Sequence, residues 1–350
     1  MNHARLTTLL EDGPDLLPAS GTVLVLGPRA DSDLSALPAG RVRAVQGFRP
    51  DHDALAARGF AVTPAPEGRG HAAALVILPR SRAEGRAMVA EAAARVAPGA
   101  PVWIDGQKTD GIDTMLRDVR ARAELSGALA RAHGRIFGFA GGDAARFADW
   151  QAQPLTPVAG FRTMPGVFSA EAVDRGSQLL AAALPSDLRG RAADLGAGWG
   201  WLAAEVLARP GVTSLDLVEA DHAALACARA NVTDPRAAFH WADATGFRPG
   251  HDLDVVVMNP PFHQGRAADP SLGAAFIGAA ARMLAPQGVL WMVANRHLPY
   301  EPALAAAFRE VVELPGNGAF KLFRASHPRR GAAAAASAVP PQRGVARCRR

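Results

Sequence analysis

The chain has 350 residues, 49% hydrophobic and 20% charged, with a formal net charge of +5 and two cysteines. This length favours two domains of an ordinary globular protein. The cysteine count excludes a disulfide framework or a cysteine zinc site, and no apolar run is long enough for a transmembrane helix. The N-terminus lacks a signal-peptide pattern, so we expect a cytoplasmic protein with no metal site and no membrane partner. The positive excess suits a polyanionic partner.

Short apolar segments alternate with amphipathic helical stretches along the chain. The first half contains VLVLG at 23–27, ALVILPR at 74–80 and PVWIDGQK at 101–108, each an expected strand with a turn beside it. Continuous apolar strands of this kind are typical of parallel sheets covered by helices on both faces. The sequence therefore predicts an α/β fold built on a doubly wound, mostly parallel sheet.

The second half repeats these segments in the same order. AADLG at 192–196 corresponds to the first segment, VVVMNPP at 255–261 to the second, and APQGVLW at 285–291 to APGAPVW at 97–103. Three matches in the same order indicate a duplication. The predicted organisation is two tandem Rossmann-like domains at 1–150 and 164–326, a linker at 151–163, and a basic tail with no fold of its own at 327–350.

A glycine-rich turn follows the first strand of the second half. Gly196 and Gly198 let the backbone approach a ligand closely. Their G-x-G-x-G spacing differs from the G-x-G-x-x-G of dinucleotide enzymes. Asp194, at the entry to the turn, is unfavourable beside a pyrophosphate but can face the ammonium of a methionine moiety. The turn thus favours S-adenosylmethionine as cofactor, while a glycine-rich turn without any ligand explains this motif alone equally well.

Two further acidic residues follow at expected strand ends. Glu219 ends the segment SLDLVE, where its carboxylate can accept hydrogen bonds from both ribose hydroxyls. Asp243 follows the next short strand and can accept one from the adenine amino group. A solvated strand end is the alternative for Glu219, and a turn-forming role is the alternative for Asp243. As a series in chain order, the acids support cofactor binding.

The segment MNPPFH at 258–263 ends a buried strand, where open α/β sheets bind ligands. Asn259 can accept one hydrogen of an exocyclic base amino group, and the Pro260 carbonyl oxygen can accept the other. Both acceptors favour the positive charge that develops on the nitrogen as it is methylated. Consecutive prolines stiffen the loop, and Phe262 can stack on the base. We therefore predict Asn259, Pro260 and Phe262 as catalytic residues; the alternative is a rigid turn with Phe262 covering the core.

The first half lacks this chemistry. It has Gly27-Pro28-Arg29 at the position of the cofactor turn and Leu78-Pro79-Arg80 at the position of the catalytic loop. The amino-hydrogen acceptor is therefore missing, and we expect a degenerate copy with a structural and RNA-positioning role. The basic residues near its strand ends are candidates for phosphate contacts, with plain solvation as the alternative: Arg29, Arg80, Arg82 and Lys108.

The motifs together resemble those of the ribosomal RNA guanine-N2 methyltransferases, which include the small-subunit methyltransferase C and large-subunit methyltransferase G proteins. The resemblance covers about residues 21–325. It rests on five segments: MPGVFSAEAVDRGSQLL at 164–180, DLGAGWG at 194–200, NPPFH at 259–263, VANRHLPY at 293–300 and AFKLFRA at 319–325. The chain departs from the family pattern at Trp199, where the turn usually carries a small residue.

The resemblance implies methyl transfer from S-adenosylmethionine to the N2 amino group of a guanine in ribosomal RNA, with small-subunit 16S RNA favoured. It implies that only the second domain is active and that ribosomal RNA, naked or in a subunit particle, is the partner of a monomeric protein. By analogy, Phe168 lies over the cofactor, Ser177 reaches its methionine end, and Lys321 contacts RNA.

Several alternatives stay open. The methyl acceptor can instead be a large-subunit guanine, adenine N6 or a protein glutamine, because related loops serve those amino groups. A non-catalytic RNA-binding assembly factor is a different class, disfavoured by the intact Asp194, Gly196, Glu219 and Asn259. A nicotinamide-dependent oxidoreductase is disfavoured by the acidic entry to the glycine turn.

Overall fold

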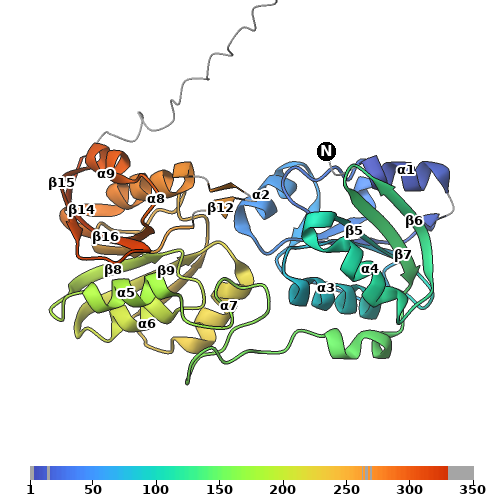
Figure 1. The fold of residues 1–350 in the computed structure, drawn as a ribbon, viewed down its shortest axis with the longest axis horizontal. Coiled ribbons are helices and arrows are strands. Elements are labelled where there is room, and N and C mark those ends of the chain that lie inside the picture. The colour runs from blue at the N-terminus through green and yellow to red at the C-terminus, as the bar shows by residue number, and fades with distance from the viewer. Residues whose placement is uncertain (1–3, 14–15, 262, 265–266, 269, 330–350) are drawn as a thin grey trace, which may run out of the picture. The chain divides into compact units, whose positions relative to one another are not determined.

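The computed structural model describes residues 4–13, 16–261, 263–264, 267–268 and 270–329. The chain forms two compact units (Figure 1): the first comprises residues 1–172 and 220–231, and the second comprises residues 173–219 and 232–350. Within the described ranges, no helix is long and apolar enough to cross a membrane. Most of the expected tail, from residue 330 onward, lies outside the described residues.

The first unit is built on a seven-stranded sheet with the order β3-β2-β1-β4-β5-β7-β6. Strands β1 to β5 run parallel, whereas β7 is antiparallel to both β5 and β6. The strands are β1 (Val23–Leu26), β2 (Val42–Val45), β3 (Ala61–Thr63), β4 (Ala73–Ile77), β5 (Pro101–Gln107), β6 (Leu125–Arg131) and β7 (Gly134–Ala140). The helices are α1 (Ala4–Asp12), α2 (Arg49–Ala57), α3 (Arg82–Arg95) and α4 (Ile112–Arg120), with 3-10 segments η2 (Ala39–Arg41), η3 (Lys108–Asp110) and η4 (Ala144–Trp150).

The second sheet has the order β10-β9-β8-β11-β14-β16-β15, the same order by position as the first. Its strands are β8 (Arg189–Leu195), β9 (Gly211–Glu219), β10 (Ala237–Trp241), β11 (Leu253–Met258), β14 (Leu284–Asn295), β15 (Phe308–Leu314) and β16 (Phe320–Pro328). The helices of this half are α5 (Arg175–Ala183), α6 (Trp201–Leu207), α7 (His222–Asn231), α8 (Pro270–Met283) and α9 (Glu301–Ala307), with a short pair β12 (His263–Gln264) and β13 (Ala267–Ala268). Helix α7 belongs to the first compact unit.

The matching strand orders confirm the predicted duplication. The repeated segments occupy equivalent strands: β1 and β8 take the third position, β4 and β11 the fourth, and β5 and β14 the fifth. All residues of β1, and all but one in each of β4 and β11, are buried, as their apolar sequences predict. Figure 1 shows each sheet with helices packed against it. The chain is thus a tandem α/β protein with two mixed sheets.

One buried ion pair fastens the N-terminal helix of the first unit to its sheet. The Arg5 guanidinium donates to both carboxylate oxygens of Asp105 on β5, over 2.6 and 3.1 Å, and to the Arg131 carbonyl oxygen over 3.1 Å. Arg5 is 1% exposed. A buried charge is tolerated only when it is paired and hydrogen-bonded, and the two-pronged geometry meets that requirement.

Candidate functional site

Three of the predicted site residues lie at one edge of the second sheet. Strands β9, β8 and β11 are adjacent and parallel, with Leu195 paired to both Val218 and Met258. Asp194, Glu219 and Asn259 therefore sit at the carboxyl ends of neighbouring strands, the edge at which open α/β sheets bind ligands.

The turn after β8 keeps its backbone exposed to a ligand. Gly196 and Gly198 adopt φ values of +78° and +56°, in the left-handed region that glycine enters without strain. A Cβ atom built on Gly198 would meet no heavy atom within 4 Å, so the space beside this residue is open. Trp199 is buried, and its indole therefore packs within the protein and does not project into that open space.

Glu219 holds the glycine turn. Its Oε2 accepts a hydrogen bond from the Gly198 backbone N–H over 2.7 Å. The Glu219 carboxylate, at the end of β9, is thereby fixed beside the glycine turn that follows β8. This is the position that the sequence predicted for it. Its proposed contacts with ribose hydroxyls stay a prediction.

Asp194 is a buried carboxyl group that, in the described part of the chain, lacks a hydrogen-bond partner at one of its two oxygens. The residue is 1% exposed, and its Oδ2 has no hydrogen-bond partner among the described residues. Burial and, secondarily, the nearby Glu219 carboxylate raise the pKa of Asp194 from 3.8 to about 8. Such a group is best satisfied by a cation or a hydrogen-bond donor, and it fits the ammonium of a methionine moiety.

The Asn259 amide is held in one orientation by helix α5. Its Nδ2 donates to Asp174 Oδ1 over 2.7 Å and to Ser177 Oγ over 3.0 Å. A carboxylate can only accept, so the amino side of the amide must face Asp174. Asn259 Oδ1 is then left on the opposite side of the amide as an acceptor. This is the group that binding of an exocyclic amine requires.

Asp174 is a site residue that sequence reasoning missed. It caps α5, because the same Oδ1 accepts the Ser177 backbone N–H over 2.8 Å. An Asp immediately before a helical segment is a recognisable N-cap signal. The contact with Asn259, 85 positions away, has no local signal. Ser177, predicted near the methionine end of the cofactor, lies against the Asn259 amide, and its cofactor contact stays a prediction.

The other predicted site residues are distributed as follows. Asp243 forms a turn in which its Oδ1 accepts from the backbone N and the Oγ1 of Thr245, over 2.8 and 2.7 Å. Pro260 is buried beside Asn259. Phe168 is 59% exposed and belongs to the first compact unit. Phe262 lies outside the described residues. The structure therefore brings together Asp194, Gly196, Gly198, Glu219, Asn259 and Ser177.

Lys321 is buried and paired within the protein. Its side chain is 8% exposed, and its Nζ donates to the Leu298 carbonyl oxygen over 2.9 Å and to a Glu301 carboxylate oxygen. The ammonium is thus paired with the loop before α9 and with the start of that helix, and the expected RNA contact stays a prediction.

In the first unit the equivalent positions carry different groups. A Cβ on Gly27, which follows β1, would meet the Met88 side chain of α3 at 2.8 Å. The equivalent contact in the second unit, from Gly196 to the Phe276 ring of α8, is 3.7 Å. Leu78, after β4, stands where Asn259 follows β11, and it is buried in the core. The first unit therefore lacks the amide acceptor of the second, in keeping with the expected degenerate copy.

The comparisons with known proteins agree with this geometry. Residues 159–324 match the family model of the methyltransferase small domain. A ribosomal RNA small subunit methyltransferase C from Shewanella sp. (strain MR-4) is 33% identical over 184 residues, which are 51% of this chain and 53% of the relative. The chain thus spans about half the length of that curated relative. The protein of the same name from Shewanella oneidensis is 29% identical over 262 residues, 71% of this chain and 75% of the relative.

A solved structure matches across both units. It is T. thermophilus 16S rRNA N2 G1207 methyltransferase (RsmC) in complex with AdoMet and guanosine, at a TM-score of 0.75 and 25% identity. The match covers 89% of this chain and 91% of the other. With its duplicated sheet, its methyltransferase small domain and its relatives of one name, the chain is similar across both units to the ribosomal RNA small subunit methyltransferase C proteins.

Proposed function

We propose that this protein transfers a methyl group from S-adenosylmethionine to the N2 amino group of a guanine in 16S ribosomal RNA. The observation that carries the proposal is the Asn259 amide, whose amino side is held by Asp174 and Ser177 so that Oδ1 is left to accept. The T. thermophilus relative, solved with AdoMet and guanosine, supports both the cofactor and the base.

The residues at the carboxyl edge of the second sheet fit the cofactor. Asp194 Oδ2, buried without a partner among the described residues, would accept from its ammonium. The open space beside Gly198 would admit it close to the backbone, and Glu219 would accept from its ribose. Bound there, S-adenosylmethionine supplies a methyl group on a positively charged sulfur.

The catalytic contribution of the chain is orientation and electrostatics. Asn259 Oδ1 accepts one hydrogen of the guanine amino group, and the Pro260 carbonyl oxygen accepts the other. Both oxygens favour the positive charge that grows on the nitrogen as its bond to the methyl carbon forms and the sulfur–carbon bond breaks. The methylated nitrogen then loses its extra proton to water, so no strong general base is needed. Alignment of the guanine amino group with the methyl group supplies much of the rate acceleration of the transfer.

The proposal also covers the macromolecular partner, the oligomeric state and the cellular compartment of the protein. The partner is ribosomal RNA, in keeping with a net charge of +5 and with the names of the relatives. The protein acts as a monomer in the cytoplasm, where ribosomal RNA is made and assembled in bacteria.

The test is the methylation state of 16S RNA in cells that lack the gene, read by mass spectrometry of ribonuclease fragments. We expect one N2-methylguanine to disappear, to return with the parent gene, and to stay absent with Asn259→Ala. Asn317→Ala, which removes an exposed asparagine in the β15–β16 turn, is the matched control and should restore the modification. Retention of every N2-methylguanine in the deleted strain would refute the proposal.

A further inference from the structure

The first unit has a hollow of about 490 Å³ lined by basic side chains of α3, α4 and the residues after α4. Four arginines line it, together with one carboxylate and one indole: Arg82, Arg86, Arg117, Arg122, Asp118 and Trp150. We call these six residues the arginine pocket. All of them lie within residues 1–172, so the arginine pocket belongs to one compact unit.

The arginine pocket carries more positive than negative charge. Asp118 is shared by Arg82 and Arg86, each at 2.9 Å, and Arg122 pairs with Asp149 at 2.7 Å. Four guanidinium groups are thus balanced by two carboxylates. Arg117 donates to Thr114 Oγ1 over 3.1 Å and has no carboxylate partner in the described part of the chain. The surplus positive charge faces an open hollow.

Trp150 fixes two of the guanidinium groups. The Arg86 and Arg122 Cζ atoms lie 5.1 and 4.8 Å from the centroid of its ring, within range of a cation–π interaction. Trp150 itself is 4% exposed and packs on Phe147. A rigid indole that holds two arginines reduces the side-chain freedom lost when they bind an anion. The arginine pocket is therefore organised before any ligand arrives.

Two donors in the arginine pocket lack acceptors. Among the described residues, neither Trp150 Nε1 nor Arg86 Nε has a hydrogen-bond partner, although both atoms are buried. Helix α3 begins at Arg82, so the positive end of its dipole lies beside the same surplus charge. Unused donors, surplus guanidinium charge and a helix start together favour an oxygen-rich anion.

We propose that the arginine pocket binds a phosphate group of the RNA backbone and so anchors the substrate on the domain that has lost its own catalytic motifs. Planar guanidinium groups bind phosphate oxygens in pairs, which suits a backbone contact that positions RNA without reading its sequence. The choice of RNA over a free anion rests on the proposed function. Of the four basic residues predicted from sequence, only Arg82 lines this hollow.

The test is equilibrium binding of protein-free 16S RNA to the full chain without cofactor, measured across a salt series. The variant Arg82→Ala/Arg117→Ala removes two charges and leaves the Trp150 stack in place. We expect about a tenfold loss of affinity near 0.1 M salt and a slope of log K against log salt that is shallower by about one to two. Circular dichroism checks that the variant is folded.

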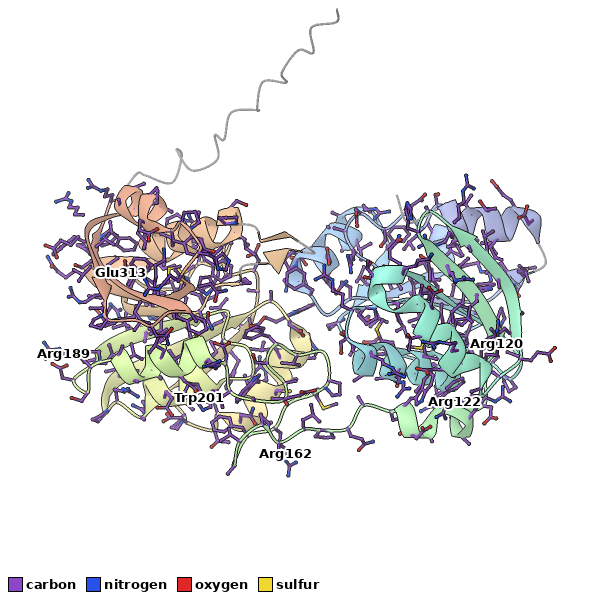
Figure 2. All side chains as sticks on the ribbon, viewed as in Figure 1. Arg120, Arg122, Arg162, Arg189, Trp201 and Glu313 are labelled. Atoms are coloured by element: carbon purple, nitrogen blue, oxygen red, sulfur yellow. The ribbon has the colours of Figure 1, made fainter. Side chains whose placement is uncertain are left out.

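A matched control distinguishes RNA binding at the arginine pocket from non-specific electrostatic attraction between the protein and RNA. Arg120, labelled in Figure 2, is an exposed residue of α4, the helix that also carries Arg117. It is not among the residues that line the hollow. Arg120→Ala/Arg189→Ala also removes two charges and should weaken binding less than about threefold. Equal losses in both double variants would overturn the proposal. So would unchanged RNA affinity together with a loss of inorganic pyrophosphate binding, because the ligand would then be a free anion.

Methylation kinetics keep this proposal distinct from the proposed function. The pocket variant should raise KM for RNA and leave kcat unchanged, because it does not alter the site at the second sheet. Asn259→Ala should bind RNA as the parent does and fail to methylate it. If the parent protein itself transfers no methyl group, the binding series still decides whether the arginine pocket holds RNA.

Discussion

Asn259 and Asp174, 85 positions apart, meet over 2.7 Å, with the amide nitrogen donating to the carboxylate that also caps helix α5. This contact determines which face of the amide is available. An asparagine side chain has a donor end and an acceptor end of similar shape, and only the acceptor end can receive a hydrogen of a base amino group. The helix cap thus orients the amide that we propose to be catalytic, which would make Asp174 a positioning residue.

We therefore expect Asp174→Asn to lower kcat by about 10- to 100-fold while leaving KM for RNA and the affinity for S-adenosylmethionine near the parental values. Asparagine is also a good N-cap, so the stability of α5 should change little. A neutral amide at this position holds the Asn259 amino group less strongly and allows the Asn259 side chain to turn over. Steady-state kinetics measures kcat and KM for RNA, and calorimetry measures the affinity for S-adenosylmethionine.

Asp143→Asn is the control for this change, because Asp143 caps η4 in the first unit with a hydrogen bond of the same kind. Its kcat should equal that of the parent. An increase in KM alone for Asp174→Asn would show that Asp174 acts in substrate binding and does not orient Asn259.

The raised pKa of Asp194, about 8 against 3.8, predicts how the cofactor-free protein responds to pH. Between these values the folded protein keeps a proton that the unfolded chain releases, so the unfolded state binds fewer protons. The free energy of unfolding therefore falls as the pH rises from about 4 to about 8. Asp194→Asn removes this contribution, and the melting temperature of the cofactor-free variant at pH 8.5 should exceed that of the parent by about 4 °C.

The same substitution should weaken cofactor binding. The ammonium of S-adenosylmethionine favours an ionised Asp194, so binding to the parent should release a proton and strengthen by up to about tenfold per pH unit between pH 6 and 8. Calorimetry in buffers of different ionisation enthalpy detects that proton. If Asp194→Asn keeps both the affinity and the pH slope of the parent, Asp194 does not contact the cofactor.

Gly198 offers a test of the turn that is independent of charge. A Cβ on Gly198 fits the protein but extends into the open space beside the turn, so Gly198→Ala should reduce cofactor affinity by about 100-fold or more, as measured by calorimetry. The positive φ of +56° should also cost about 1 kcal/mol of stability.

Gly99→Ala in the first unit separates those two effects. Gly99 has a φ of +77° and likewise no heavy atom within 4 Å of an added Cβ. Its substitution should produce a similar loss of stability in denaturant titrations with no change in cofactor affinity. Equal cofactor affinities in the two variants would mean that the turn at Gly198 does not approach the ligand.

The topology was accessible from sequence because it depends on repeated local patterns. The segments at 23–27 and 192–196 were paired by their apolar character and following glycine, and they form the equivalent strands β1 and β8. The cap at Asp174 was equally local, but its contact with Asn259 depends on how α5 packs beside the sheet. The surroundings of Lys321 likewise depend on packing and cannot be predicted from local sequence. A lysine is normally exposed, and only the fold reveals that Glu301 and the Leu298 carbonyl oxygen enclose this one.

The Arg5–Asp105 pair predicts how strongly the first unit depends on its N-terminal helix. Asp105→Ala leaves a guanidinium that is 1% exposed without its carboxylate, which should lower the free energy of unfolding of the first unit by about 3–5 kcal/mol. Asp53→Ala removes the exposed partner of Arg49 and should cost no more than about 1 kcal/mol. Hydrogen exchange of the β5 amides, which reports the opening of this sheet, compares the two variants. Similar protection in both would show that Arg5 finds other partners or water once Asp105 is gone, and that the pair does not hold α1 on the sheet.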